Sequence, residues 1–216
     1  MAISRAKEVI LKKVRRALSH PSPLPFPSSE GVQNIFTSTK EESVVTFAEE
    51  FTRLQGKFAY CTDKADMLDQ LLGLFKNATW EKYYYTESFI TDLLSQKVER
   101  HTDLASCDVA ITGCEYLIAR TGSIVLSSAR DHGRTASVYA PIHICLAFVN
   151  QLKDDIRNAL QELKGLNSGD FPSLITFASG PSRTADIEKT LVTGVHGPKE
   201  VYCFLIEDEA TTKTTI

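Results

Sequence analysis

The stretch EESVVTFAEEFTRLQGKFAYC, residues 41–61, decides the fold class because it joins a helical pattern directly to a strand pattern. Its apolar residues first recur at the spacing of one helix face, Gly56 then marks the end of that helix, and KFAYC favours a strand. Residues 63–77 repeat the helical pattern with Asp63 as the predicted cap, and a short strand and a third helix are predicted over 82–97. This alternation predicts an α/β sheet of mainly parallel strands that is flanked by helices.

The second half of the chain has more closely spaced strand patterns. Residues 108–129 hold three apolar runs, and the last break between them is the turn pair Thr121-Gly122. A further strand is predicted over 142–149, followed by a helix that Asn150 would cap. This part of the chain is therefore expected to be richer in strands than the first half.

The N-terminus differs from the rest of the chain. Residues 1–20 place apolar side chains on one helix face and most Lys and Arg on the other, which predicts an amphipathic helical arm. Residues 21–40 form a predicted Pro-rich linker, residues 41–208 the main domain and residues 209–216 a C-terminal tail. Packing of the arm on the body or on another subunit is favoured over binding to a membrane surface or an acidic partner.

The charge balance argues against nucleic acid as a partner. The 216 residues carry 24 basic and 27 acidic side chains, mixed along most of the chain, with a formal net charge of -3. They provide no basic field for a phosphate backbone. No apolar run approaches the ~20 residues that span a bilayer, and the N-terminus lacks the pattern of a signal peptide. The sequence predicts a cytoplasmic protein without a membrane span.

The cysteine and histidine spacing predicts no metal site in this chain. The five cysteines are widely spread and form no C-x-x-C pair, whereas iron–sulfur and structural zinc sites usually take two ligands from one short motif. The H-x-x-x-H and H-E-x-x-H pairs are missing, as are the common hydrolase, P-loop and dinucleotide fingerprints. We therefore expect no metal or cofactor bound by this chain, and any redox metal to belong to a partner.

The stretch ASGPSRTADIEKTLVTGVHGP, residues 178–198, is the first candidate site. The chain is predicted to leave a strand at Ser179-Gly180 and to enter a helix near Pro181. Gly180 would let the backbone approach a ligand, unpaired N–H groups would begin the helix, and Arg183 adds positive charge, which together suit phosphate or carboxylate. The alternative is a capped helix without a ligand. The residues assigned to this anion site are Ser179, Gly180, Ser182, Arg183 and Thr184.

Three further places combine polar residues with predicted strands or loops. Thr121, Gly122 and Ser123 offer hydroxyls and N–H groups at the mouth of a strand, which either bind an oxyanion or make a turn. His143 lies within an apolar strand and is either a buried, satisfied histidine or a catalytic one. His196 lies between two glycines, where it is a cap, an orienting group or a proton carrier.

The loop RDHGRTASVYAP, residues 130–141, also gathers charge. Arg130, His132 and Arg134 cluster there, and the loop is long enough to cover a site. A solvated loop is the default interpretation for such residues, so this loop is not assigned to the site.

Four segments within residues 119–198 resemble the LUD-domain family, which is typified by lactate-utilisation protein C: ARTGSIVL, YAPIHICL, SGPSRTADIE and GVHGP. The resemblance implies an α/β fold similar to the NagB/RpiA/CoA-transferase-like group. It also implies a role in oxidising L-lactate to pyruvate, as one component of a three-protein system whose other members are iron–sulfur oxidoreductases. The expected partners are those subunits and a small anionic ligand. The oligomeric state is left open, and a homo-oligomer is one alternative.

The resemblance also implies a set of site residues by position. The catalytic candidates are His143 and His196. In relatives an acidic residue commonly precedes the Thr-Gly pair, and this sequence has Arg120 there, which puts an acyl-transfer mechanism based on that acid in doubt. The ligand-binding candidates are Thr121, Gly122, Ser123, Ser179, Gly180, Ser182, Arg183, Thr184, Asp186 and Gly197.

Three functions follow as hypotheses. The leading one is an accessory or substrate-handling subunit of an iron–sulfur-dependent lactate oxidation system, with an anion site around Arg183. The second is a stand-alone enzyme acting on a small phosphorylated or nucleotide-linked substrate, with His143 or His196 moving a proton. The third is an assembly protein whose basic arm docks partners.

Overall fold

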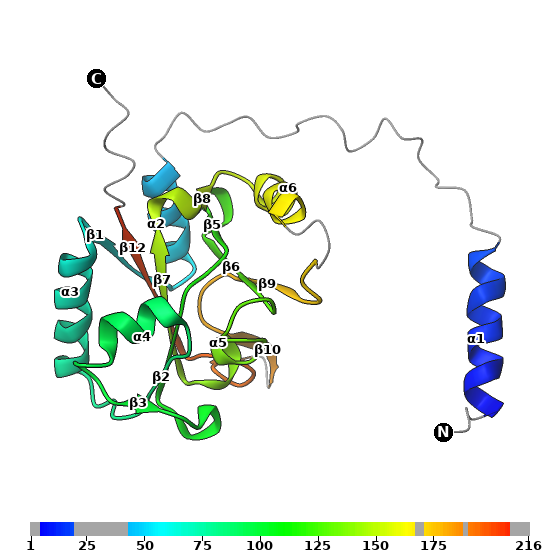
Figure 1. The fold of residues 1–216 in the computed structure, drawn as a ribbon, viewed down its shortest axis with the longest axis horizontal. Helices are drawn as coiled ribbons and strands as arrows, with labels where there is room; N and C mark the ends of the chain where they lie inside the picture. The colour runs from blue at the N-terminus through cyan, green and yellow to red at the C-terminus, as the bar shows by residue number, and fades with distance from the viewer. Residues whose placement is uncertain (1–4, 20–42, 167–170, 188–189, 208–216) are drawn as a thin grey trace. The chain divides into compact units, whose positions relative to one another are not determined.

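The computed structural model describes residues 5–19, 43–166, 171–187 and 190–207 (Figure 1). The chain divides into two compact units, residues 1–38 and 39–216. The first unit contains α1 (Arg5–Leu18), the amphipathic helix expected for the arm. The predicted linker over 21–40 and the predicted tail over 209–216 lie outside the described residues.

Six parallel strands form the main sheet of the larger unit, in the order β1-β12-β7-β4-β2-β3 (Figure 1). The two longest strands of this sheet, β7 and β12, lie inside it and are almost continuous apolar runs, as strands covered on both faces require. The predicted fold class, a mainly parallel α/β sheet flanked by helices, is confirmed. The strands are β1 (Lys57–Cys61), β2 (Tyr83–Tyr84), β3 (Arg100–His101), β4 (Val109–Thr112), β7 (Ile142–Phe148) and β12 (Glu200–Ile206).

Two helices cover one face of the main sheet. They are α3 (Lys64–Asn77), which follows β1, and α4 (Ser88–Leu94), which follows β2. Asp63 caps α3 as predicted, because its carboxylate accepts a hydrogen bond of 2.8 Å from an N–H in the first turn. Leu71 of α3 and Ile90 of α4 are fully buried in one cluster with apolar residues of β4 and β7.

The opposite face carries α2 (Ser43–Arg53) and a second sheet of order β8-β5-β6-β9. Its strands are β5 (Tyr116–Ile118), β6 (Ser123–Ser127), β8 (Leu152–Lys153) and β9 (Ile175–Ala178). Phe47 of α2 and Leu117 of β5 pack in one buried cluster with Cys145 of the main sheet. Other residues of β5 and β6, such as Tyr116 and Val125, pack against α6 (Ile156–Leu166), so these two strands are buried on both faces.

One predicted helix is wrong. The sequence predicts a helix over residues 184–192, but β10 (Arg183–Ile187) and β11 (Thr190–Thr193) form an antiparallel strand pair there. Many residues of this stretch are β-branched, which lowers helix propensity and favours strands. The Pro and Ser residues before it suit a turn as well as a helix start. The β-branched residues are Thr184, Ile187, Thr190, Val192 and Thr193.

The helix after β7 begins later than predicted. The turn η3 (Val149–Gln151) and β8 come first, and Asp155 rather than Asn150 stands at the start of α6. Asp155 Oδ1 accepts a hydrogen bond of 2.9 Å from the Arg157 N–H. No helix in the described parts of the chain is long and apolar enough to cross a membrane. The remaining elements are α5 (Ala136–Tyr139), η1 (Leu104–Ser106) and η2 (Ala119–Thr121).

Candidate functional site

The structure brings the Thr121–Ser123 motif next to the start of residues 178–198, which we call the hairpin segment. The Ser123 and Ser179 hydroxyls lie 2.7 Å apart, although the two residues are 56 positions apart in the sequence. Thr121 Oγ1 donates to Ser123 Oγ at 2.9 Å. Three of the predicted ligand-binding residues therefore share one place, at the contact between β6 and the end of β9.

The glycines of both motifs contact the end of helix α2. Gly122 has a φ of +54°, and a Cβ there would lie 2.5 Å from the backbone nitrogen of Phe51. Gly180 has a φ of +84°, and its Cβ would lie 2.5 Å from the carbonyl oxygen of Leu54. The same carbonyl accepts a hydrogen bond from Arg183 Nη2. These residues hold the last turn of α2 in place, a packing role that explains why glycine is needed at both positions.

The hairpin segment does not provide the helix N-terminus on which the anion prediction relied. Ser182 precedes β10, and Arg183, Thr184 and Asp186 lie in that strand. The Ser182 N–H donates to the Pro198 carbonyl at 2.9 Å instead of facing a ligand. The helix-dipole part of the prediction is wrong because the backbone here is extended. The positive charge of the exposed Arg183 side chain remains.

The two predicted catalytic histidines lie in different environments. His143, on β7, is fully buried, whereas His196 is exposed in the loop between β11 and β12. The described contacts of His143 include Thr112 of β4, and none of them reaches His196. Gly197 packs closely on Ser182, since a Cβ at Gly197 would lie 3.0 Å from the Ser182 Cβ. His143 and His196 do not form one catalytic pair within the described structure.

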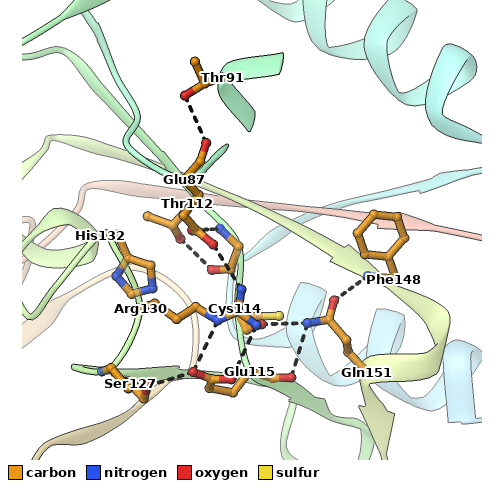
Figure 2. A network of polar contacts seen from close by, with 12 residues as sticks. Glu87, Thr91, Thr112, Cys114, Glu115, Ser127, Arg130, His132, Phe148 and Gln151 are labelled. Atoms are coloured by element: carbon orange, nitrogen blue, oxygen red, sulfur yellow. Dashed lines mark hydrogen bonds and ion pairs between the residues drawn. The ribbon is translucent and has the colours of Figure 1, made fainter. Parts of the chain in front are cut away.

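A charged network that the sequence did not predict lies just beyond the carboxyl ends of β2 and β4 (Figure 2). Arg130 Nη1 donates to Glu87 Oε2 at 3.0 Å, and Arg130 Nε lies 3.2 Å from Glu115 Oε1. Figure 2 shows the guanidinium between the two carboxylates. The exposed side-chain fractions are 6% for Glu87, 28% for Arg130 and 18% for Glu115. We call these residues, together with the adjacent His132, the Arg130 network.

Neutral groups fix both carboxylates of the Arg130 network. The Gly113 N–H donates to Glu87 Oε1 at 2.5 Å, and Ser127 Oγ donates to Glu115 Oε1 at 2.7 Å. A Cβ at Gly113 would lie 2.9 Å from Glu87 Oε2, so glycine permits this close approach. Gln151 Nε2 donates to two backbone carbonyls after β4, at 2.6 and 3.3 Å (Figure 2). Besides the guanidinium, a backbone N–H thus holds the Glu87 carboxylate and a hydroxyl holds the Glu115 carboxylate.

His132 contributes an unprotonated nitrogen to the Arg130 network. Its Nδ1 lies 3.0 Å from the Gly133 carbonyl, and because a carbonyl only accepts, Nδ1 carries the proton. Nε2 then holds the lone pair, and it is buried without a hydrogen-bond partner among the described residues. Burial lowers the pKa of His132, and the charge of Glu87 opposes that shift only in part. The ring is therefore neutral near pH 7.

His143 shows the same feature on the neighbouring strand β7. Thr112 Oγ1 donates its one proton to the Gly113 carbonyl at 2.8 Å, so it accepts from His143 Nε2 at 2.9 Å. Nδ1 then holds the lone pair and is buried without a partner in the described structure. Burial lowers the pKa of His143 to about 3, and the electrostatic effect of His132 adds to this shift. His143 therefore also presents an imidazole nitrogen that has no partner among the described residues.

The charges of the Arg130 network favour proton transfer over anion binding. Two carboxylates face one guanidinium, so the network carries a net charge of one minus two, or -1, with both histidines neutral. Burial would lower the pKa of Arg130, but Glu115 and Glu87 outweigh it and raise the pKa. An anion would meet a guanidinium already shared by two carboxylates, whereas His132 offers a lone pair for a proton next to carboxylates that favour its charged form. The arrangement suits general acid–base chemistry.

The sequence contained a weak signal for this network. The solvated-loop interpretation is wrong for His132, which is 4% exposed, and for Arg130, which is partly buried. It holds for Arg134, which is exposed. Glu87 and Glu115 were not predicted, yet each lies three positions after the last residue of its strand. Acidic residues so placed lie at the edge where α/β sheets bind ligands.

The cysteines are distributed through the core. All five are free and buried, and Cys145 and Cys203 are direct neighbours on β7 and β12. Within the described ranges, no group of three or more His, Cys, Asp or Glu side chains is placed to hold a metal ion. The assignment of iron–sulfur clusters to partner proteins remains a prediction.

Comparison with known proteins gives relatives that match part of this chain. An uncharacterized protein of Neisseria meningitidis is 34% identical over 119 residues, which cover 55% of this chain and 49% of the relative. Lactate utilization protein C of Halalkalibacterium halodurans is 32% identical over 142 residues, covering 60% of this chain and 62% of the relative. The matched region thus spans about half to three-fifths of the length of these relatives.

A solved structure and a family model complete the comparison. The crystal structure of a DUF162 family protein from Deinococcus radiodurans matches 76% of this chain and 96% of its own, with a TM-score of 0.55 and 18% sequence identity, which supports the fold. The family model described as the LUD domain matches residues 82–206, more than half of the chain. Those residues include the whole Arg130 network and the hairpin segment, and the chain belongs to the LUD-domain family.

Proposed function

We propose that this chain is a component of a lactate-utilisation system and handles the substrate or a proton in it. The proposal rests on membership of the LUD-domain family and on relatives that are named lactate utilization protein C. The family resemblance adds the reaction, L-lactate to pyruvate, and partner proteins that carry iron–sulfur clusters. The chain would work in the cytoplasm with those partners.

The observation that carries the proposal is the free Nε2 lone pair of His132 inside the Arg130 network. Oxidation of a 2-hydroxy acid to a 2-oxo acid releases two protons and two electrons. In this proposal the O–H and C–H bonds break as the C=O bond forms, and His132 Nε2 accepts the hydroxyl proton. The two electrons and the proton from the C–H bond pass to the iron–sulfur partner proteins. Glu87 and Glu115 then stabilise the imidazolium that forms. This chain therefore supplies proton transfer and not the redox group.

An anion contact at the hairpin segment is the finer part of the proposal. Its support is now the exposed charge of Arg183 and the paired hydroxyls of Ser123 and Ser179, without a helix N-terminus. A carboxylate bound there would lose affinity on Arg183→Ala. Thermal shift of the wild type and this variant with L-lactate, pyruvate and phosphate measures that loss.

Growth tests the lactate role directly. Deleting the gene in its own host should abolish or strongly slow growth on L-lactate and leave growth on pyruvate unchanged, because only the oxidation step is lost. The deletion is made in a strain without a second LUD-domain gene, so that no paralogue masks the effect. Normal growth on lactate would refute the proposal.

Two measurements separate the proposed role from the other hypotheses. Turnover of a phosphorylated or nucleotide-linked substrate by the purified chain alone would favour a stand-alone enzyme. Partner binding that survives every site variant but fails after removal of residues 1–18 would favour an assembly protein with the basic arm as its docking element.

A further inference from the structure

A cleft lies at the carboxyl edge of the main sheet, on the face covered by α3 and α4. Its volume is about 370 Å³. Met67 of α3 and Ile206 at the end of β12 are buried and form its floor. Phe89 and Leu93 of α4 and Phe148 at the end of β7 form its walls. Open α/β sheets commonly bind ligands at this edge.

The size and lining of the cleft suit a small aromatic molecule. Cavities of roughly 300–1,000 Å³ hold small organic ligands, usually between apolar walls with a few polar groups. The rings of Phe89 and Phe148 lie with their centroids 6.3 Å apart and tilted by 55°, and both remain partly exposed. A flat ring can bury apolar area against both rings and against Leu93, which an aliphatic chain would do less well.

One charge of each sign stands at the mouth of this cleft. Lys64, the first residue of α3, places its Nζ 5.6 Å from the centroid of the Phe148 ring. Asp92 of α4 lines the same cleft, and both side chains are exposed. Lys64 therefore favours one negative group next to the aromatic wall, while Asp92 disfavours a second.

We infer that the cleft between α3 and α4 binds a planar aromatic monocarboxylate, with its ring packed against Phe89, Leu93 and Phe148 and its carboxylate at Lys64. This site is separate from the Arg130 network and does not depend on the lactate role. The two places are linked through one residue, because Gln151 accepts from the Phe148 N–H at 2.8 Å and donates to the carbonyls after β4. A ligand that contacts Phe148 is thus connected to the Arg130 network through the side chain of Gln151.

The methionines allow a direct test with the full chain. The sequence has two methionines, Met1 and Met67, and Met67 lies in the floor of the cleft. With ¹³C-methyl-methionine labelling, titration with 1-naphthoate should shift the Met67 methyl signal and leave that of Met1 in place. The expected Kd is on the order of 0.1–1 mM for a ligand of this size. A Met67 signal that stays unmoved at saturating probe concentrations overturns the inference.

The charge of Lys64 and the apolar walls of the cleft are tested with separate variants. Lys64→Gln should weaken 1-naphthoate binding about threefold to tenfold and leave the neutral 1-naphthalenemethanol unaffected. Lys76→Gln, on the last turn of the same helix and away from the cleft, is the matched control and should change neither. Equal affinity of the wild type for the two probes would overturn the carboxylate assignment.

Leu93→Trp should fill the cleft and remove binding of both probes. If the NMR spectrum shows that this variant does not fold, Phe89→Ala removes one wall instead and should weaken both probes in parallel. Unchanged binding in the folded variant would overturn the location. None of these results depends on growth on lactate, so a failure here leaves the proposed function standing, and the reverse is also true.

Discussion

The Arg130 network and the hairpin segment differ in how conspicuous they are in the sequence and in the role that their residues have in the structure. The hairpin segment is the most conspicuous polar motif of the chain, yet its glycines and Arg183 hold the end of α2. The Arg130 network is built from residues scattered between positions 87 and 132, and it buries a guanidinium between two carboxylates. Conspicuous glycine and serine residues therefore need not mark chemistry, whereas buried, paired charges mark either chemistry or a strict structural constraint.

The energetic contrast between the two regions is the first prediction. Arg130→Met leaves Glu87 buried without its counter-ion, so the free energy of unfolding should fall by roughly 3 kcal/mol, the lower end for a partly exposed pair. Urea denaturation followed by circular dichroism measures this. Arg183→Met is the matched control, because Arg183 is exposed, and it should cost less than about 1 kcal/mol. Equal losses of unfolding free energy in both variants would contradict the predicted difference between the two regions.

The packing role of the hairpin segment gives the second prediction. Gly180→Ala should destabilise the protein by about 2 kcal/mol, since it combines a positive φ with a contact to the Leu54 carbonyl. Gly133→Ala is the control: its φ is also positive, at +65°, but its Cβ would meet open space, so about 1 kcal/mol is expected. Thermal unfolding of both variants isolates the contact with α2. A Gly180→Ala variant as stable as Gly133→Ala would contradict the packing role.

The pH dependence of stability gives the third and smallest effect. The folded pKa of His143, about 3, lies below the ordinary value near 6.5, so the unfolded state binds more protons as pH falls below 6.5. Stability should therefore decrease from pH 6.5 downwards, and His143 should account for about 1 kcal/mol of the loss at pH 5.5. His143→Gln keeps a donor to Thr112 at the place of Nε2 and should flatten this part of the profile.

Urea denaturation at each pH between 7 and 5.5 measures this profile for the wild type and for His143→Gln. If His143→Gln left the slope of the wild type unchanged, the burial argument for His143 would fail.

Most strands of the main sheet could be predicted from the sequence, but the Arg130 network could not. Strands such as β7 and β12 are nearly unbroken apolar runs, and α3 begins at its Asp63 cap, so periodicity and capping predict them. The pairing of β10 with β11 was missed because Pro and Ser before a strand resemble a helix start. The first few residues alone do not decide between a helix and a strand here. The β-branched residues that follow, from Thr184 to Thr193, favour the strand pair.

The Arg130 network could not be predicted from the sequence for a different reason. Glu115 and Arg130 are charged residues outside the predicted elements, and Glu87 is the first residue of a predicted helix. Most charged residues at such places are solvated. Their burial follows from strand order, which places β2 next to β4 and brings the loop after β6 over both ends. Strand order is a property of the whole fold, so no single stretch of sequence carries it.

Complementation of the gene deletion with two variants tests the central claim, that the Arg130 network and not the hairpin segment carries the chemistry. His132→Asn keeps a donor to the Gly133 carbonyl but lacks the Nε2 lone pair, so it should fold and fail to restore growth on L-lactate. Arg183→Ala, produced at the same soluble level, should restore growth, at most with a higher lactate requirement. Full growth with His132→Asn and none with Arg183→Ala would contradict the claim.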